Sequence, residues 1–284
     1  MDTQCPKVMI RFLCMKLISL NTYGGRLFEP IMAFIEKHKA DTDVFYFQEI
    51  YSNPKENIMV DLHEPRVNLF EELSRALGDF TGHIAIAQDD YEIKTEIAGC
   101  SYFGLSTFVK TSLQIVDVHE FFLCNGRNTF IGNQRWDTMG YNALAITMDI
   151  NGTPLTVVNL HGNALPAHKL DDPIRDEQTR RVLEFCKQLD GEIVICGDFN
   201  SLPHIESIRA FERNGFRDLV KEFEIKTTRG SMMRKLFPQY EHGSYGFQEF
   251  ADYTFVTPGV TVESFEVPDE PISDHLPMIL ECTV

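Results

Sequence analysis

The sequence predicts an α+β fold in which two β-sheets pack face to face and helices cover their outer faces. Three observations lead to this prediction. Strand candidates outnumber helix candidates, five strand candidates follow one another without a helix, and a few amphipathic helices interrupt the other strands. No repeat, low-complexity tract or linker divides the 284 residues, so we expect residues 15–284 to form a single domain.

The first part of the chain predicts a strand, a turn and a helix. Residues 16–20 form a short apolar strand, residues 22–25 (Thr-Tyr-Gly-Gly) form a turn, and residues 28–38 carry apolar side chains at helical spacing. The apolar run at 44–47 is too short for a helix, which indicates a strand covered on both faces. Residues 68–77 predict a second helix.

Strands dominate the middle of the chain. The Asn151-Gly152 pair is a strong signal for a hairpin turn between the last two of five candidates. These candidates are residues 82–87, 102–109, 115–122, 142–150 and 154–160. Because no helix separates them, we expect them to form an antiparallel sheet.

The last part of the chain predicts two helices and four strands. An amphipathic helix is predicted from Pro173 to about Asp190, and a second one at 205–214 is closed by Gly215. The strand candidates are residues 192–196, 253–257, 260–267 and 277–282. Residues 227–250 are the only long stretch without an assignment, and loops of this length are usually functional or mobile.

Composition constrains the cellular setting. The first apolar run is interrupted by Arg11 and Lys16 and lacks a cleavage signal, so we expect residues 1–14 to be an optional extension without a signal peptide. Seven cysteines occur singly, which argues against a disulfide framework and a zinc knuckle. No run approaches the roughly 20 apolar residues of a membrane span. We expect a cytoplasmic protein.

Charge constrains the partners. Lys and Arg total 26 against 42 Asp and Glu, which gives a formal charge of −16. Proteins that bind long duplex nucleic acid gain most of their affinity from cationic side chains. A long duplex is therefore an unlikely substrate unless a local basic patch compensates, and a small or single-stranded one is favoured. Oligomeric state is not specified by these features.

Polar residues follow four apolar strands. Asn21, Glu49 and His161 each end one strand, and Asp198-Phe199-Asn200 ends another. Each residue alone is also typical of an ordinary turn or a solvated loop. Together they suggest that carboxylates, amides and imidazoles converge on one hard cation and one phosphate.

Six segments resemble, in order, the successive motifs of the endonuclease/exonuclease/phosphatase superfamily. They extend from Leu17 to Met278 and read LISLN, FQEI, VVNLHGN, VICGDFNS, DYTFV and PISDHLPM. GDFN after an apolar strand, with SDH near the C-terminus, is a specific signal. The resemblance implies a four-layer αββα sandwich and a metal-dependent hydrolase of phosphate esters, either a phosphodiesterase or a phosphatase.

The resemblance also implies a metal site. Glu49 would ligate the ion, Asn21 would lie beside it, and Asp274 would contribute a further carboxylate. Mg²⁺ suits such a site because it prefers oxygen ligands and binds through one or two carboxylates together with substrate phosphate. Mn²⁺ is able to substitute.

The same resemblance implies catalytic roles. Asp198 would position and deprotonate the attacking water. Asn200 and His275 would donate hydrogen bonds to the phosphoryl oxygens, and Asp252 would fix the tautomer of His275. His161 matches a histidine that binds phosphate or protonates the leaving oxygen in many phosphodiesterase members.

Substrate-binding residues are less well marked. The family often has Arg or a similar residue shortly before the DYxF acid, where this chain has Phe250-Ala251. Arg175, together with Gln178, matches a helix whose start faces the substrate, although such a pair is also typical of a solvated face. Other candidates for binding a phosphate or nucleotide, which are also compatible with dispersed surface charge, are Arg127, Arg135, Trp136, Arg229, Arg234 and Lys235.

Three functions remain open at this point. The leading one is a phosphate-ester hydrolase that acts on a nucleic-acid end, a nucleotide, an inositol phosphate or a phospholipid head group, because loops choose the substrate on a shared fold. A DNA-end or abasic-site nuclease is the alternative within the superfamily. A catalytically silent binding scaffold is the alternative from a different class.

Overall fold

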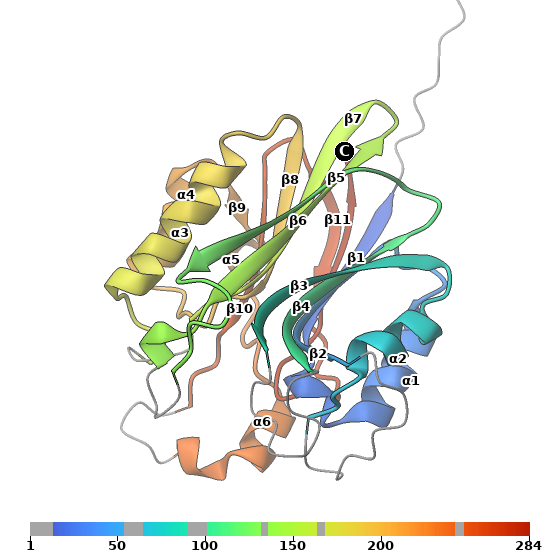
Figure 1. The fold of residues 1–284 in the computed structure, drawn as a ribbon. Helices are drawn as coiled ribbons and strands as arrows, with labels where there is room; N and C mark the ends of the chain where they lie inside the picture. The colour runs from blue at the N-terminus through green and yellow to red at the C-terminus, as the bar shows by residue number, and fades with distance from the viewer. Residues whose placement is uncertain (1–13, 54–64, 90–100, 132–135, 164–167, 242–246) are drawn as a thin grey trace, which may run out of the picture.

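The computed structural model describes residues 14–53, 65–89, 101–131, 136–163, 168–241 and 247–284. Within these residues the strands form two six-stranded sheets that face each other (Figure 1). The first sheet has the order β11-β12-β1-β2-β4-β3 and the second has the order β5-β6-β7-β8-β10-β9. Each sheet contains both parallel and antiparallel pairs, so the predicted pair of mixed sheets is confirmed.

Most strand boundaries are close to the predicted ones, but β2 continues five residues past its predicted end at residue 47, and the two-residue strand β9 was not predicted. The first sheet consists of β1 (Met15–Asn21), β2 (Val44–Ser52), β3 (Phe80–Asp89), β4 (Tyr102–Lys110), β11 (Thr261–Glu266) and β12 (Met278–Thr283). The second consists of β5 (Gln114–Cys124), β6 (Tyr141–Ile150), β7 (Thr153–His161), β8 (Glu192–Asp198), β9 (Arg217–Asp218) and β10 (Asp252–Val256).

Helices cover both outer faces (Figure 1). On the first sheet, α1 (Phe28–His38) and α2 (Leu69–Ala76) pack against alternate residues of β1 and β2, such as Ile18 and Phe45. On the second sheet, α3 (Pro173–Cys186) and α4 (Glu206–Arg213) complete the layer. The opposite faces of β1 and β2 join the second sheet in one core, so the four-layer arrangement is confirmed.

One predicted sheet is wrong. The five consecutive strand candidates do not form a single antiparallel sheet, because β3 and β4 belong to the first sheet whereas β5, β6 and β7 belong to the second. The reason is that β4 is already paired on both sides, with β2 and with β3. It has no free edge for β5, so residues 111–113 carry the chain across to the other sheet.

Short elements follow α4. The structure places α5 (Leu219–Glu222), α6 (Ser231–Leu236) and the 3₁₀ turn η3 (Pro238–Glu241) there, so the unassigned stretch 227–250 includes one helix and one turn. The predicted extension at 1–14 lies outside the described residues except for Cys14. No helix in the described part of the chain has the length and apolar character of a membrane span.

The two parallel pairs position the functional residues. In the β1–β2 pair Asn21 lies opposite Gln48, and in the β7–β8 pair His161 lies opposite Asp198. Because the strands of each pair run in the same direction, Asn21 at the end of β1 lies beside Gln48 within β2, and the polar ends of β7 and β8 lie side by side. The antiparallel partner β10 begins there, with Asp252 opposite Asp198.

Candidate active site

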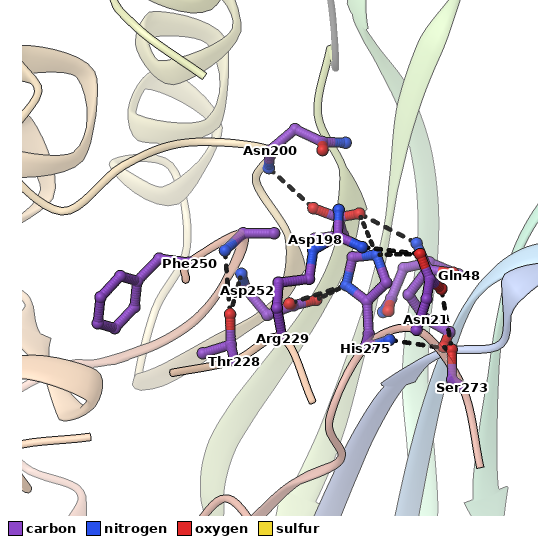
Figure 2. A network of polar contacts seen from close by, with 12 residues as sticks. Asn21, Gln48, Asp198, Asn200, Thr228, Arg229, Phe250, Asp252, Ser273 and His275 are labelled. Carbon is purple, nitrogen blue, oxygen red and sulfur yellow. Dashed lines mark hydrogen bonds and ion pairs between the residues drawn. The ribbon is translucent and has the colours of Figure 1, made fainter. Parts of the chain in front are cut away.

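Asp198 lies at the centre of a buried polar cluster (Figure 2). Its Oδ2 accepts a hydrogen bond from Nδ2 of Asn21 at 3.0 Å, and Nε2 of His161 and Nε2 of His275 each lie 3.6 Å from that oxygen. Its Oδ1 accepts from the backbone N–H of Asn200 at 2.8 Å. Both sheets therefore contribute side chains to one carboxylate.

The surroundings of Asp198 favour its ionised form. Burial by itself would raise the pKa of this carboxyl, but His275, His161 and nearby cations outweigh that effect, so the pKa of Asp198 lies below its usual value. Asp198 is therefore a carboxylate at neutral pH and is able to accept a proton.

Glu49 reaches the cluster through a β-bulge. The pairing of β2 with β4 passes from Gln48 directly to Ile50, so Glu49 is the extra residue. Its φ of 56° is a conformation that non-glycine residues rarely adopt, and such strain is typical of functional sites. The bulge brings the Glu49 Oε1 atom to 3.1 Å from Nδ2 of Asn21.

Asp252 holds His275 in one orientation. The Nδ1 atom of His275 lies 3.0 Å and 2.9 Å from the two carboxylate oxygens of Asp252, and both residues are buried. Burial and Arg229 act to lower the pKa of His275, but the carboxylates of Asp252, Asp274 and Asp198 outweigh them and the pKa is raised. The imidazole of His275 therefore keeps its second proton to a higher pH than a free histidine does, and its Nε2 faces Asp198.

Asp274 is bound by an arginine. Nη1 of Arg229 donates to Oδ2 of Asp274 at 2.8 Å, and both side chains are less than one tenth exposed. Burial would lower the pKa of Arg229, yet Asp274, Asp198 and Asp252 raise it, so the guanidinium remains charged. Of the predicted substrate-binding residues that the structure describes, Arg229 is the one in the cluster (Figure 2).

The donor set fits a hard divalent cation. Among the described residues no cationic side chain forms an ion pair with the partly buried Glu49, and burial raises the pKa of its carboxyl. A carboxylate in that setting gains from a bound cation. Single donor atoms of Asp198, Asp252 and His275 also lie within 4.8 Å of one another.

The amide of Asn21 is turned differently from the expected ligand. Its Nδ2 donates to Glu49 and Asp198, whereas its Oδ1 accepts from the backbone N–H of Tyr23 at 3.0 Å. In this arrangement Asn21 orients two carboxylates and does not present an oxygen to a metal.

The other predicted substrate-binding residues are not among the described members of the cluster. Arg175 is 1% exposed, and its guanidinium donates to Asp172, Leu170 O and Asn163 O, so it anchors the start of α3 and is not open to substrate. Trp136 opens the turn η2 (Trp136–Thr138). Arg135 lies outside the described residues.

Several residues of the site were not anticipated. The Oγ1 atom of Thr228 accepts from the backbone N–H groups of Ala251 and Asp252, and Ser273 Oγ donates to the backbone oxygen of Asn21. Lys169 lies 7% exposed beside the same cluster. They come from irregular segments without periodicity, so no sequence signal singled them out.

Two further residues did carry a signal. Gln48 and Asn159 are polar residues inside apolar strands, and Nε2 of Gln48 donates to Oδ1 of Asn159 at 2.6 Å. Nδ2 of Asn159 also donates to the backbone oxygens of Phe47 and Ser106. These bonds connect the two sheets directly behind the cluster.

Comparison with known proteins identifies a matching family and several similar structures. The sequence profile of the Endonuclease/Exonuclease/phosphatase family matches residues 18–275. No curated protein matches. An endonuclease/exonuclease/phosphatase from Bacteroides vulgatus superimposes with a TM-score of 0.68 at 18% identity, covering 95% of this chain and 98% of that one.

Two other structures share the fold. The mannosyl-6-phosphatase of Bacteroides thetaiotaomicron gives a TM-score of 0.66 at 18% identity, covering 95% of this chain and 100% of its own. The human Nocturnin catalytic domain with bound sulfate gives 0.65 at 15% identity, with 100% of each chain covered. At these identities the likeness establishes the fold alone.

Proposed function

Because the chain belongs to the endonuclease/exonuclease/phosphatase family, we propose that it is a divalent-metal-dependent hydrolase that cleaves phosphate esters with an activated water. One observation carries this proposal. Asp198 is a buried carboxylate with a lowered pKa, and two histidines direct Nε2 at the same oxygen from 3.6 Å. A carboxylate that is able to accept a proton and two imidazole nitrogens thus converge on one point.

The roles follow from this geometry. Asp198 takes a proton from the attacking water as the new bond to phosphorus forms. His275, which Asp252 holds through Nδ1, donates a hydrogen bond to a phosphoryl oxygen whose negative charge grows in the transition state. His161 is placed to protonate the leaving oxygen, and Asn200 supplies a further hydrogen-bond donor.

A divalent ion belongs to the proposal. Glu49 and Asp274 would hold it, because both are carboxylates at the edge of the cluster. When bound, the ion would supply Lewis-acid stabilisation of charge on the phosphoryl oxygen. We propose Mg²⁺, with Mn²⁺ as a substitute, on the basis of the oxygen-rich donor set.

The substrate proposal rests on charge. With a formal charge of −16 the protein repels a long polyanion wherever cations do not cluster. We therefore propose a small or single-stranded phosphate ester. One of the similar structures is named as a mannosyl-6-phosphatase, and this name is compatible with a small substrate for the present protein.

Turnover of chromogenic esters tests this function. Wild-type protein should hydrolyse 4-nitrophenyl phosphate or bis(4-nitrophenyl) phosphate with Mg²⁺ and lose that activity in EDTA. Asp198→Asn should lower this activity by roughly 10²–10⁴-fold, whereas the exposed Asp190→Asn should leave it unchanged. If the folded protein hydrolyses neither ester in the presence of Mg²⁺, the proposed function is refuted.

A further inference from the structure

Two cations from irregular segments meet the carboxylate cluster. Arg229 precedes α6 and Lys169 precedes α3, and they are 8% and 7% exposed. Cations that are buried to this extent normally have all their donors engaged. Neither does here.

The hydrogen-bond donors of Arg229 are only partly used. Its Nη1 donates to Asp274 at 2.8 Å and approaches Sδ of Met233 at 3.9 Å. Its Nε is buried without a hydrogen-bond partner, and within the described residues the hydrogen bonds of the guanidinium come from Nη1. The Nε–Nη2 edge of a guanidinium is a fork that matches two oxygens of a phosphate or carboxylate. An unpaired buried donor is costly, so this edge is suited to an anion from outside the chain.

The donors of Lys169 are also only partly used. An ammonium has three N–H donors, and within the described residues Nζ makes one hydrogen bond, to the backbone oxygen of Phe250 at 2.8 Å. No described carboxylate forms an ion pair with it. Burial, followed by the nearby charge of Arg229, lowers the pKa of Lys169 to about 7. An anion that contacts both side chains would favour the charged form of the ammonium, so bound phosphate should raise the pKa of Lys169.

We propose that Arg229 and Lys169 bind the non-bridging oxygens of a terminal phosphate, so that the preferred substrate is a phosphate monoester. The inference rests on the proposed function. A monoester carries about two negative charges near neutral pH and presents three non-bridging oxygens, whereas a diester presents two and one charge. Arg229 and Lys169, in addition to the metal and the histidines, match the extra oxygen and the extra negative charge that a monoester has over a diester. Hydrolysis adds water across the P–O bond and releases an alcohol and inorganic phosphate.

Paired substrates and a binding measurement test the inference. kcat/KM is measured with Mg²⁺ for 4-nitrophenyl phosphate and for bis(4-nitrophenyl) phosphate, and the affinity for inorganic phosphate is measured by calorimetry. The variants are Arg229→Gln and Lys169→Met. Matched controls are Arg213→Gln at the end of α4 and Lys187→Met just after α3, which alter exposed cations.

Each site variant should reduce kcat/KM for the monoester, and weaken phosphate binding, by roughly ten- to a hundredfold, the range expected for one charged hydrogen bond. The diester should be affected much less, and the controls should match wild type. If Arg229→Gln does not fold, Arg229→Lys replaces it. This variant keeps a positive charge beside Asp274 but lacks the paired N–H donors of the guanidinium, so it should still lower kcat/KM for the monoester.

Equal losses for the two esters, or phosphate binding that is unchanged in both site variants, would overturn the inference while the proposed hydrolase function stands. If wild type hydrolyses neither ester, the hydrolase proposal fails, and the calorimetry still decides whether these cations bind phosphate. A hexose 6-phosphate and a 5′-phosphorylated single-stranded oligonucleotide each carry a terminal phosphate. Comparing kcat/KM for the two shows whether the preferred monoester belongs to a sugar or to a nucleic-acid end.

Discussion

Nδ2 of Asn21 donates to Oδ2 of Asp198 at 3.0 Å, and this hydrogen bond joins the first sheet to the second inside the polar cluster. The residues are far apart in the chain, so the geometry of the site depends on how the two sheets are held together. Gln48 and Asn159 form the second link, directly behind the first.

Asn159→Leu should destabilise the protein. The change removes the partner of Gln48 and leaves the backbone oxygens of Phe47 and Ser106 buried without their donor. Each such group costs about 1–3 kcal/mol, so we expect a loss of about 3 kcal/mol or more in the free energy of unfolding. Denaturant unfolding measures it. The exposed Asn214→Ala is the control, and an unchanged midpoint for Asn159→Leu would refute the role.

Glu49→Gln and Asp198→Asn should separate metal binding from catalysis. Glu49 lacks a cationic partner among the described residues, so its neutral variant should weaken Mg²⁺ or Mn²⁺ binding by at least about tenfold. Asp198→Asn should leave metal affinity nearly intact and lower turnover by roughly 10²–10⁴-fold, the usual size of a general-base contribution. Metal titration by calorimetry distinguishes them, and the opposite pattern would reverse the assigned roles.

The pH profile of kcat/KM should have two limbs. Activity is lost as pH falls through the pKa of Asp198, which lies below its usual 3.8, and as pH rises through that of His275, which lies above its usual 6.5. Asp252→Asn removes a carboxylate that raises the pKa of His275, so the alkaline limb should move to lower pH. An alkaline limb that does not move would show that His275 does not control it.

Asp218→Asn should stabilise the protein at neutral pH. Burial raises the pKa of Asp218 from 3.8 to about 6, so the folded state binds the proton more tightly than the unfolded chain does. Stability contributed by this group is present below pH 3.8 and is lost as pH rises to about 6, at a cost of about 2–3 kcal/mol. Asparagine keeps an oxygen for the backbone N–H of Lys221, which Asp218 caps at 3.2 Å.

Thermal melts across pH measure this effect. The gain of Asp218→Asn over wild type should be large at pH 7.5 and should vanish near pH 4, whereas Asp190→Asn should show no trend. A variant that is less stable than wild type at pH 7.5 would contradict the assignment.

Binding to long duplex DNA should be weak and should involve few phosphates. The cations at the cluster, Arg229 and Lys169, are too few to offset a formal charge of −16. The slope of log affinity against log salt counts neutralised phosphates at about 0.9 for each contact. Tight binding at physiological salt with a slope of about five or more would support the DNA-nuclease alternative.

The sequence by itself determined the strands, the main helices and the residues that end the strands. Apolar periodicity is a local property, so the stretches around Leu17, Val157 and Ile195 could be assigned without knowledge of their partners. Asn21, Glu49, His161 and Asp198 were found for the same reason, because each follows such a stretch directly.

The tertiary structure decided which strands share a sheet and which cations reach the carboxylates. Periodicity shows that β4 and β5 are strands but not that β4 has both edges occupied, which depends on pairing with β2 and β3. In the same way Arg175, Arg229 and Lys169 are equally charged in the sequence. Packing seals Arg175 against α3 and brings the other two to Asp274 and Asp198, since the contacts of a loop side chain are set by segments distant in the chain.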